Sequence, residues 1–415
     1  MTTNWPGIPN SVALRRAYAG TEIYAGTAVT PTFRLYGKMV LNPKRPLADR
    51  EEFAGTFFAD YTPVYGPWEV DGTYEQPLTY EDLAILPRYS LAGGSAGVSD
   101  GQATPGYLYT RRPHATRIDF DAMTLESGVP GMPWRATDLF FPEFTISGDI
   151  DDSEAAWKWS SPVKAATTDL IAATTGTATG GSTSTVVKTA AGWTVNQFQG
   201  GYVRMLTGTA GNIGQVREIA SNDATTLTLV GLFPSAVANT DTFEISGMFT
   251  AGIADRTRET IDAPGTLLYL DGSSAIGTTL QTMRFISFSV TYQSGVTGMK
   301  RFMENVDTLS SKPDQGKKRV VGQVRLEFDN RDQYDAWKAK TVRKIRIKKE
   351  GSTIDTGAAT KKLGQIDVYA AQWSEMSVDE RQNNITCTWG FRGFVDATEG
   401  VPFQILAKNK LNVLP

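Results

Sequence analysis

The chemistry open to this chain is limited by its one histidine, His114, and its one cysteine, Cys387, among 415 residues. A cysteine-based zinc cluster, a multi-histidine metal site and an internal disulfide all need more of these residues than the chain has. A nucleophile activated by histidine needs that histidine at hand. His114 follows Arg111, Arg112 and Pro113 in a loop-like stretch with no partner nearby in sequence. We therefore expect a surface histidine and no catalytic residues, so the chain is not expected to be an enzyme.

An acidic cluster, Asp149, Asp151 and Asp152, is a second candidate, because closely spaced carboxylates can bind calcium. The residues that follow lack the glycine and the final glutamate of an EF-hand loop, so we expect the acidic tip of a hairpin. The glycine-rich stretch 208–214 lies between strand-like segments, with no lysine and no helix start, which argues against a phosphate-binding loop. Neither pattern predicts a cofactor or a metal.

Basic residues are concentrated toward the C-terminus. Residues 300–415 hold 21 basic and 15 acidic side chains, whereas residues 1–160 hold 13 and 20. A phosphate-binding surface is one interpretation. The other is a solvated strand face, or a surface complementary to the acidic part of a neighbour. Within 343–349 the charges alternate with Ile345 and Ile347, which favours a strand whose basic residues face outward.

The elements that must position these residues are predicted to be mainly β-strands. Large apolar residues alternate with polar ones, as in a half-buried strand, in segments 32–41, 116–123, 323–328, 343–348 and 385–391. Forty glycines and 20 prolines supply the turns. Two short helices are expected at 80–86 and 331–340, each preceded by a residue that can cap a helix.

These two helices occupy equivalent places in a repeated order of elements. The order in each half is two strands, a long polar loop, a strand, the helix, a strand, a hairpin and an acidic turn. The sequence thus predicts two copies of a small β domain, at 1–165 and 250–415. Between them, residues 166–249 begin with a linker-like run of small residues and continue as short strands. We expect this segment to be an inserted β module on the outer surface.

Targeting and membrane signals are not expected. The opening residues, MTTNWPGIPN, show no basic region followed by an apolar run, and no stretch approaches 18 uninterrupted apolar residues.

The second copy resembles the C-terminal part of the tail tube proteins of long, non-contractile-tailed bacteriophages. The recognisable part is the order of a strand, the sequence EFDN, a helix containing YDAW, a strand and a closing RGFxD segment. The segments that carry the resemblance are 267–279 (LLYLDGSSAIGTT), 324–347 (VRLEFDNRDQYDAWKAKTVRKIRI), 361–373 (KKLGQIDVYAAQW) and 388–411 (TWGFRGFVDATEGVPFQILAKNKL). The first copy is similar in element order only, and the duplication and the insert depart from simple members of the family.

The resemblance implies two tandem tail-tube-type β-sandwich domains, each with one short helix. It also implies a structural virion protein of the tail, made in the host cytoplasm, whose rings stack into a tube that conducts double-stranded DNA during ejection. A single-copy subunit forms six-membered rings, so a duplicated chain is expected to form trimers with pseudo-sixfold symmetry. The implied partners are further copies of itself, the tape measure, terminator and distal tail proteins, and DNA in transit without specific binding. The family has no catalytic residues to carry over.

Two sets of candidate residues follow from this interpretation. The long loops 42–63 and 293–318 are expected to mediate contacts between rings, because loops of this length are usually functional. Their apolar anchors are Phe53, Phe57, Phe58, Met299, Phe302 and Met303. A channel for DNA should be neutral to acidic, and candidates for its lining are Asp119, Asp121 and Asp138.

Two other classes of protein remain open at this point. A glycan-binding tail-tip or surface β protein would use the inserted module, and tube formation by the purified protein would distinguish it from a tube subunit. A phage polysaccharide hydrolase is the weaker alternative, because the paired carboxylates that glycosidases use are not identifiable in the sequence.

Overall fold

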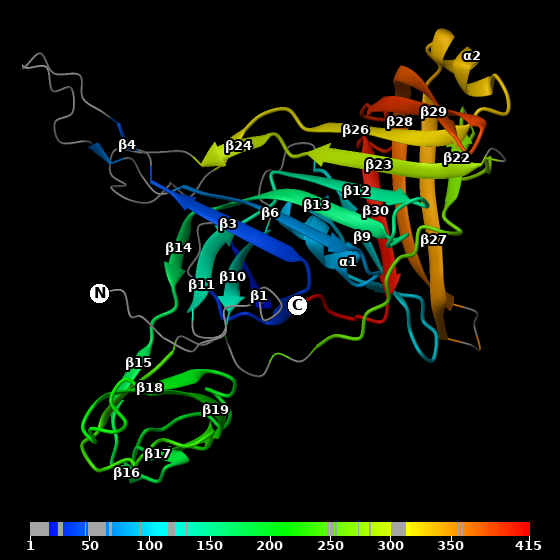
Figure 1. Cartoon of the computed structure of the whole chain (residues 1–415). Coiled ribbons are helices and arrows are strands. Elements are labelled where there is room, and N and C mark those ends of the chain that lie inside the picture. Colours follow the sequence, from blue (N-terminus) through cyan, green and yellow to red (C-terminus); the bar gives the residue numbers. More distant parts are fainter. Residues whose placement is uncertain are drawn as a thin grey trace, which may run out of the picture.

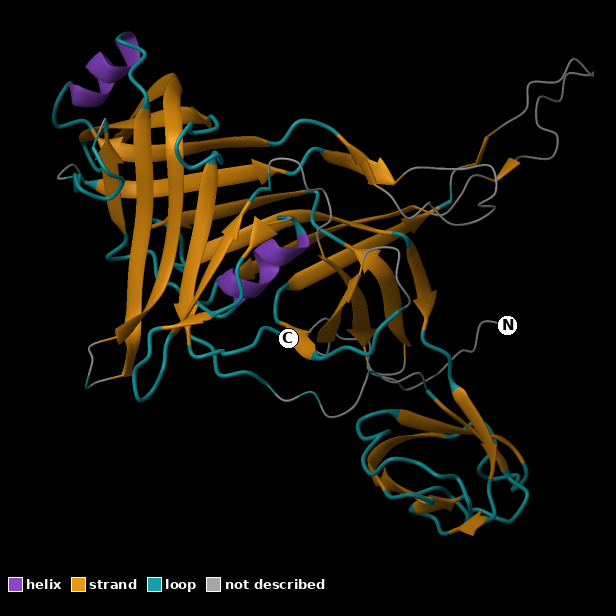
Figure 2. Ribbon diagram, turned by 180° about the vertical axis from the view of Figure 1, so that it is seen from behind, coloured by secondary structure: helices purple, strands orange, loops and turns teal. Residues whose placement is uncertain are grey.

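The computed structural model consists of β-strands with two short α-helices, so the mainly β expectation is confirmed (Figures 1 and 2). It describes residues 16–23, 28–45, 47–48, 64–65, 69–91, 93–114, 121–129, 132–246, 249, 253, 255–272, 274–281, 284–299, 313–355, 357 and 360–415. Within these residues the strands form one large sheet, a five-stranded sheet, a seven-stranded sheet and two small ribbons.

The largest sheet contains eight neighbouring antiparallel strands, which we call the main sheet. In spatial order they are β3 (Lys38–Lys44), β6 (Glu69–Pro77), β13 (Trp157–Ala165), β12 (Glu143–Asp149), β23 (Phe285–Gln293), β26 (Arg319–Glu327), β29 (Asn384–Gly393) and β28 (Thr360–Arg381). The first four strands come from the N-terminal half of the chain and the last four from the C-terminal half. They meet where β12 pairs with β23. One continuous sheet therefore spans both halves.

Two further groups of strands extend from or accompany the main sheet and share its apolar core. The five-stranded sheet has the order β14 (Thr167–Leu170), β11 (Met132–Leu139), β10 (Asp121–Val129), β1 (Arg16–Ile23) and β2 (Phe33–Leu35). In the second group, the N-terminal part of β28 pairs on one side with β27 (Arg343–Asp355), followed by β22 (Leu267–Asp271). On its other side it pairs with β30 (Phe403–Asn409), followed by β9 (Tyr107–Arg112), which pairs with β7 (Gly93–Gly94) and β8 (Val98–Ser99).

Strand pairing follows the same order in the two halves. β1, β10, β11 and β14 are successive neighbours in one half, and β22, β27, β28 and β30 are successive neighbours in the other. Likewise, β3-β6-β13-β12 corresponds to β23-β26-β29-β28. Strands β6 and β26 also bury the same positions, their second, sixth and eighth residues, around a glycine at the fourth, Gly72 or Gly322. The arrangement of one half thus recurs in the other.

Two expected strands have different bounds in the structure. The strand expected at 32–41 is divided into β2 of the five-stranded sheet and β3 of the main sheet, which begins at Lys38 and continues to Lys44. A first ribbon follows, in which β5 (Val64–Tyr65) pairs with β4 (Leu47–Ala48). Of the strand expected at 116–123, the described part begins at Asp121. A second ribbon, β24 (Val296–Met299) with β25 (Pro313–Gln315), stands between β23 and β26 as β4 and β5 stand between β3 and β6.

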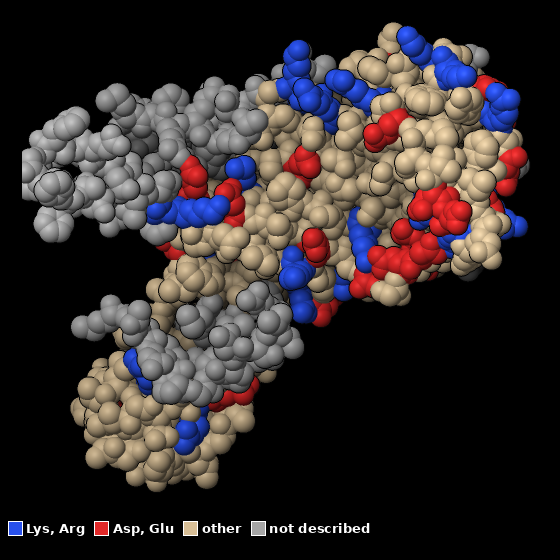
Figure 3. All heavy atoms as spheres, turned by 45° about the horizontal axis from the view of Figure 1, so that its top comes forward, with Lys and Arg blue, Asp and Glu red and all other residues tan. Residues whose placement is uncertain are grey.

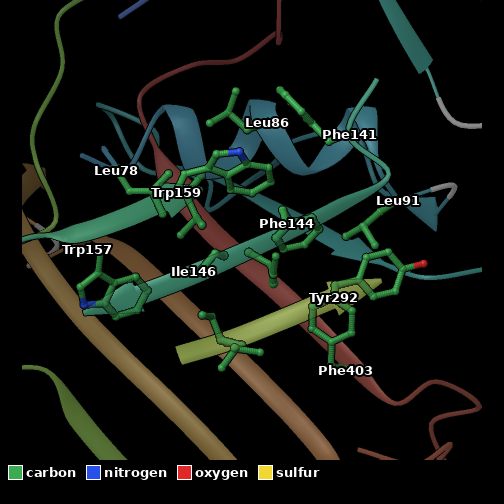
Figure 4. Close-up of a cluster of buried hydrophobic side chains, with 14 of the residues drawn as sticks. Leu78, Leu86, Leu91, Phe141, Phe144, Ile146, Trp157, Trp159, Tyr292 and Phe403 are labelled. Atoms are coloured by element: carbon green, nitrogen blue, oxygen red, sulfur yellow. The ribbon is translucent and has the colours of Figure 1, made fainter. Parts of the chain in front are cut away.

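The core forms because strands of the main sheet such as β12, β13 and β23 alternate buried residues with more exposed ones. In β23 the buried residues are Ile286, Phe288, Val290 and Tyr292, and the residues between them point to the other face. Large aromatic side chains fill the interior, and the rings of Phe144 and Trp159 stack with centroids 4.4 Å apart. Figure 4 shows this cluster between the strands of the main sheet and the helical segment above them.

The two helices lie where the sequence predicted them. α1 (Asp82–Ile85) continues into a 3-10 helix, η2 (Leu86–Tyr89), and α2 (Asp332–Lys338) follows β26. The hydroxyl of Thr79 accepts a hydrogen bond from the Asp82 N–H at 3.1 Å, and the Asn330 side chain accepts one from the Asp332 N–H at 3.0 Å. All four residues of α1 are buried. In Figure 2, seen from behind, α1 lies in front of the strands.

The inserted segment forms a separate seven-stranded sheet with its own apolar cluster (Figure 1). Its strands, in spatial order, are β15 (Thr174–Thr177), β21 (Thr242–Ile245), β18 (Tyr202–Thr207), β19 (Val216–Asn222), β20 (Thr226–Val230), β17 (Thr185–Val187) and β16 (Gly180–Gly181). The expected start at residue 166 is too early, because Thr167–Leu170 forms β14 and pairs with β11 in the five-stranded sheet. The strands of the module begin at Thr174.

Candidate functional site: the polar face of the main sheet

The candidate surface is the face of the main sheet that points away from the core, which we call the polar face. It is built from the residues that alternate with the buried ones in each strand. Its uncharged members include Val40, Asn42, Thr73, Thr145, Ser147, Ser160, Ser287, Ser289, Thr291, Gln293, Val321, Gln323, Gln372, Ser377 and Thr388. Small hydroxyl and amide side chains therefore make up much of this surface.

The centre of the polar face is the line where β12 and β23 meet, which we call the internal seam. Thr145 and Thr291 face each other across it, with their hydroxyls 2.8 Å apart. The side-chain amide of Gln293 donates a hydrogen bond to the Glu143 carboxylate at 2.8 Å. The polar groups along the internal seam thus bind to each other across the two halves of the chain.

Charges on the polar face are balanced. Eight are basic (Lys38, Lys44, Lys158, Lys164, Arg319, Arg325, Arg381 and Arg392) and eight are acidic (Glu69, Asp71, Glu75, Glu143, Asp149, Glu327, Glu375 and Asp379). Figure 3, which brings the upper side of Figure 1 forward, shows blue and red side chains over a larger uncharged area, with a group of red ones at the lower right. This face offers neither a strongly basic nor a strongly acidic surface to a polymer.

Several of these charges are paired within the sheet. Asp71 binds Lys164 at 3.2 Å and Lys44 at 3.3 Å. Burial alone would raise the pKa of the Asp71 carboxyl, but the hydrogen bonds and charges of the two lysines outweigh that effect and lower it. Arg325 binds Asp379 across the sheet at 3.0 Å. Pairing of this kind reduces the charge available to a passing ligand.

The acidic run that the sequence singled out forms the turn between β12 and β13, at one end of the polar face. Asp151 accepts a hydrogen bond from the Arg381 guanidinium at 2.6 Å, and this bond lowers the pKa of the Asp151 carboxyl. Lys158 binds Asp152 at 2.7 Å. The turn is therefore held by ion pairs to residues of β28 and β13. Within the described part of the chain, no three His, Cys, Asp or Glu residues gather as they would around a metal ion.

The structure places two of the three lumen candidates away from the polar face. Asp121 on β10 forms an ion pair with Arg88, and Asp138 on β11 donates its N–H to the buried carboxylate of Glu22. Burial raises the pKa of that Glu22 carboxyl. Both strands belong to the five-stranded sheet. Asp119 lies outside the described residues. The residues of the polar face were not among the predicted lumen residues, although the alternating polar residues of strands such as 285–293 indicate them.

Of the six loop candidates, only Met299 is among the residues that the structure describes. Phe53, Phe57, Phe58, Phe302 and Met303 fall outside the described residues, and Met299 is the last residue of β24. Strand pairs β4–β5 and β24–β25 form the bases of the two long loops, each between corresponding strands of the main sheet. Both loops therefore start from equivalent points of the fold.

Four of the five basic residues of 343–349 bind partners of their own chain. Ile345 and Ile347 are fully buried in β27, and the charges alternate with them, as the sequence predicted. Arg346 makes two hydrogen bonds to the buried carboxylate of Asp367, at 2.7 and 2.9 Å. Lys348 binds Glu350 at 2.8 Å. This strand is not part of the main sheet, so these charges do not belong to the polar face.

The remaining chemical candidates have local structural partners. The backbone carbonyl of His114 accepts a hydrogen bond from Lys318 at 2.6 Å. Cys387 is buried on β29, and burial raises the pKa of its thiol. In the glycine-rich stretch of the module, the Thr209 N–H donates to the carboxylate of Asp241 at 2.9 Å. The Asp241 carboxylate thus already accepts the hydrogen bond from a backbone N–H that a phosphate would need.

Comparison with known proteins adds no assignment: no protein-family model and no curated protein matches the chain. Among the described residues, no helix has both the length and the apolar character needed to cross a membrane.

Proposed function

We propose that this chain is a structural virion protein, the subunit of a phage tail tube, which polymerises as stacked rings around a channel for double-stranded DNA. In this proposal the two halves are tandem β-sandwich domains of the tail-tube type, and three chains make one ring with pseudo-sixfold symmetry. The polar face lines the channel. The protein acts without catalysis or a cofactor, in the tail of the virion.

The observation that carries the proposal is the main sheet itself. Four strands from each half, paired in the same order, form one continuous sheet of eight strands. Three such sheets joined edge to edge would give a closed wall of 24 strands. Closure into a barrel would also remove the exposed strand edges that favour uncontrolled association. The resemblance of residues 267–411 to tail tube proteins supports the same interpretation.

The chemistry of the polar face suits a channel through which DNA must move. Each phosphate neutralised by a lysine or arginine releases counterions and adds affinity, so a long basic tube would retain DNA. The polar face has equal numbers of basic and acidic residues, several of them paired, among many hydroxyl groups. These properties support weak, non-specific contact with DNA.

Electron microscopy of the purified full-length protein tests this proposal. We expect rings with threefold symmetry and hollow tubes in negative stain. Tubes should retain double-stranded DNA weakly at physiological salt, and raising the salt should change that retention only slightly. A protein that stays monomeric at high concentration contradicts the tube, and tight, salt-sensitive binding of DNA inside tubes contradicts a neutral channel.

A further inference from the structure

Both ends of the main sheet are open among the described residues. β3 pairs with β6 on one side only, and residues 372–381 of β28 pair only with β29. Unpaired backbone N–H and C=O groups along such an edge can accept a further strand. The two edges carry different side chains, so they can be matched to each other.

The internal seam contains the counterparts of these two edges. Because the pairing order recurs, β23 is the counterpart of β3, and β12 is the counterpart of the C-terminal part of β28. β12 and β23 pair antiparallel over seven residues, from Glu143 opposite Gln293 to Asp149 opposite Ser287. The chain therefore contains one example of how these two kinds of edge join.

Strand registers identify the equivalent residues of β3 and β23. Gly72 and Gly322 are the fourth residues of β6 and β26, which have the same burial pattern. Leu41 is opposite Gly72, and Val290 is opposite Gly322. Leu41 is thus equivalent to Val290, and the next residue, Asn42, is equivalent to Thr291.

The same method relates β12 to β28. Across β13, Thr145 is opposite Ser160, which is opposite Glu75. Across β29, Ser377 is opposite Thr388, which is opposite Arg325. Glu75 and Arg325 are both the seventh residues of their strands, so Ser377 is the equivalent of Thr145.

We propose that residues 375–381 of β28 pair antiparallel with β3 of a second copy of this chain, in the register of the internal seam. This inference rests on the proposed ring and specifies its joint. Ser377 lies opposite Asn42 of the second copy, as Thr145 lies opposite Thr291 in the internal seam. Glu375 then lies opposite Lys44, and Asp379 lies opposite Val40.

The charges of the two edges are complementary. The β28 edge carries Glu375, Asp379 and Glu380 with only Arg381 in opposition, whereas β3 carries Lys38 and Lys44 and no acid. Opposite charges across an interface favour the correct partner and its register. A lysine-bearing edge also disfavours pairing with a second copy of itself.

Two side-chain pairs strengthen this register. Glu375 is the equivalent of Glu143, which accepts a hydrogen bond from Gln293 in the internal seam. At the joint between copies, Lys44 takes the place of Gln293, so an ion pair replaces the neutral donor. On the core side, Val378 is 60% exposed in the single chain and lies opposite Leu41 in this register. The joint would remove that apolar side chain from water.

Engineered disulfides test the register directly. Directly opposite residues of an antiparallel pair have Cα atoms about 4.5–5.5 Å apart, within the range that a disulfide bridges. The full-length variant with Asn42→Cys and Ser377→Cys should therefore oxidise to covalent dimers and trimers, with the trimer as the largest species on a denaturing gel. The native Cys387 is buried, so the unaltered chain serves as the background control.

A mismatched pair controls for random collision. Lys44→Cys with Asp379→Cys places the thiols on the same face but four residues out of register, about 13 Å apart at the rise of a strand. This variant should remain uncross-linked under the same oxidation. Equal cross-linking of both variants, or of neither, overturns the proposed register.

Charge reversal gives a second readout without new cysteines. Lys44→Glu should abolish assembly because the new carboxylate faces Glu375, and adding Glu375→Lys should restore it. Lys38→Glu is the matched control, since Lys38 faces Arg381 in this register and the change should preserve assembly. Thermal unfolding of each variant confirms folding. Loss of assembly by Lys38→Glu together with no rescue by the double variant contradicts the joint.

The outcomes separate this inference from the proposed function. Covalent trimers from Asn42→Cys with Ser377→Cys, without tubes in the microscope, would support the joint and reject the tube. Hollow tubes that never cross-link between residues 42 and 377 would support the tube and overturn the joint.

Discussion

At the scale of single residues, Gly72 and Gly322 have the same constraint in the two halves. A Cβ atom on Gly72 would lie 2.1 Å from the carbonyl oxygen of Val40, and one on Gly322 would lie 2.4 Å from that of Ser289. Both obstacles are backbone atoms of the neighbouring strand, which a rotamer change cannot relieve. In each half, the strand that carries the glycine approaches its neighbouring strand closely because no side chain separates them.

We expect Gly72→Ala and Gly322→Ala each to lower the free energy of unfolding by about 1–3 kcal/mol, the usual cost of overpacking. Urea denaturation followed by circular dichroism measures the loss. The matched control is Gly272→Ala, because the nearest atom to its Cβ is a side-chain nitrogen of Arg343 at 4.0 Å. Losses no larger than that of the control would contradict this explanation of the close strand approach.

Asp271 is a residue whose contribution should depend on pH. Its buried carboxylate accepts hydrogen bonds from the Gly277 N–H at 2.6 Å, the Thr278 hydroxyl at 2.7 Å and the Thr279 N–H at 2.7 Å. Burial alone would raise the pKa of Asp271, but these bonds, with that of Thr278 the strongest, outweigh it and lower the pKa. The depressed value means that the stabilisation is present above the ordinary aspartate pKa and is lost as pH falls through the folded-state value.

We therefore expect Asp271→Asn to cost about 1–3 kcal/mol at neutral pH, as for hydrogen bonds to a charged group. The difference from the unaltered protein should narrow as pH falls below about 4, where aspartate becomes protonated. Urea unfolding at pH 7, 5, 4 and 3 measures this difference, with the exposed Asp329→Asn as control. A difference that stays constant over this range would rule out the charged form as the origin of the stabilisation.

At the scale of elements, alternation along the sequence predicted which side of a strand is buried, but not which sheet the strand joins. The basic strand 343–349 was interpreted correctly, with Ile345 and Ile347 inward. Asp121 and Asp138 were assigned to a channel face, yet their strands belong to the five-stranded sheet. Alternation of apolar and polar residues specifies which face of a strand is buried. The neighbours of that strand in the sheet depend on contacts between residues that are distant in sequence.

In the proposed tube, we expect the two long loops to join one ring to the next. Their bases, β4–β5 and β24–β25, occupy equivalent positions in the two halves. Replacing residues 49–63 or 300–312 with a short Gly-Ser turn should leave folded rings that no longer polymerise into tubes. Negative-stain microscopy and sedimentation measure the outcome. Normal tube formation by both variants would refute the assignment of Phe53, Phe57, Phe58, Phe302 and Met303 to contacts between rings.

At the scale of the whole molecule, the inserted module is separable by its own core and by the position of its ends. Thr174 on β15 lies directly opposite Ile245 on β21, so the chain enters and leaves the module at adjacent points. Opposite residues of an antiparallel pair are only about 5 Å apart, a gap that a short linker closes. An independent module with adjacent ends tolerates removal.

We expect a chain lacking residues 173–246 to fold, form rings and assemble into tubes, as measured by size-exclusion chromatography and negative stain. The isolated segment 173–246 should also unfold cooperatively on heating. A deletion that starts at Thr167 is the control, because it removes β14 and its pairing with β11 and should destabilise the five-stranded sheet. Failure of the shorter deletion to assemble would make the module part of the ring.

In the proposed ring of three chains, the internal seam has a kinetic consequence. Such a ring would have six junctions between domains, and three of them would be internal seams within single chains. Linking two partners in one chain replaces their bulk concentration with an effective concentration, which is about millimolar for short flexible linkers. Dilution could therefore open only the other three junctions. Disassembly would release the six domains of a ring as three whole chains of two domains each, and subunits would exchange between rings as whole chains. A fused subunit of this kind makes the lifetime of a ring depend on fewer bond-breaking events.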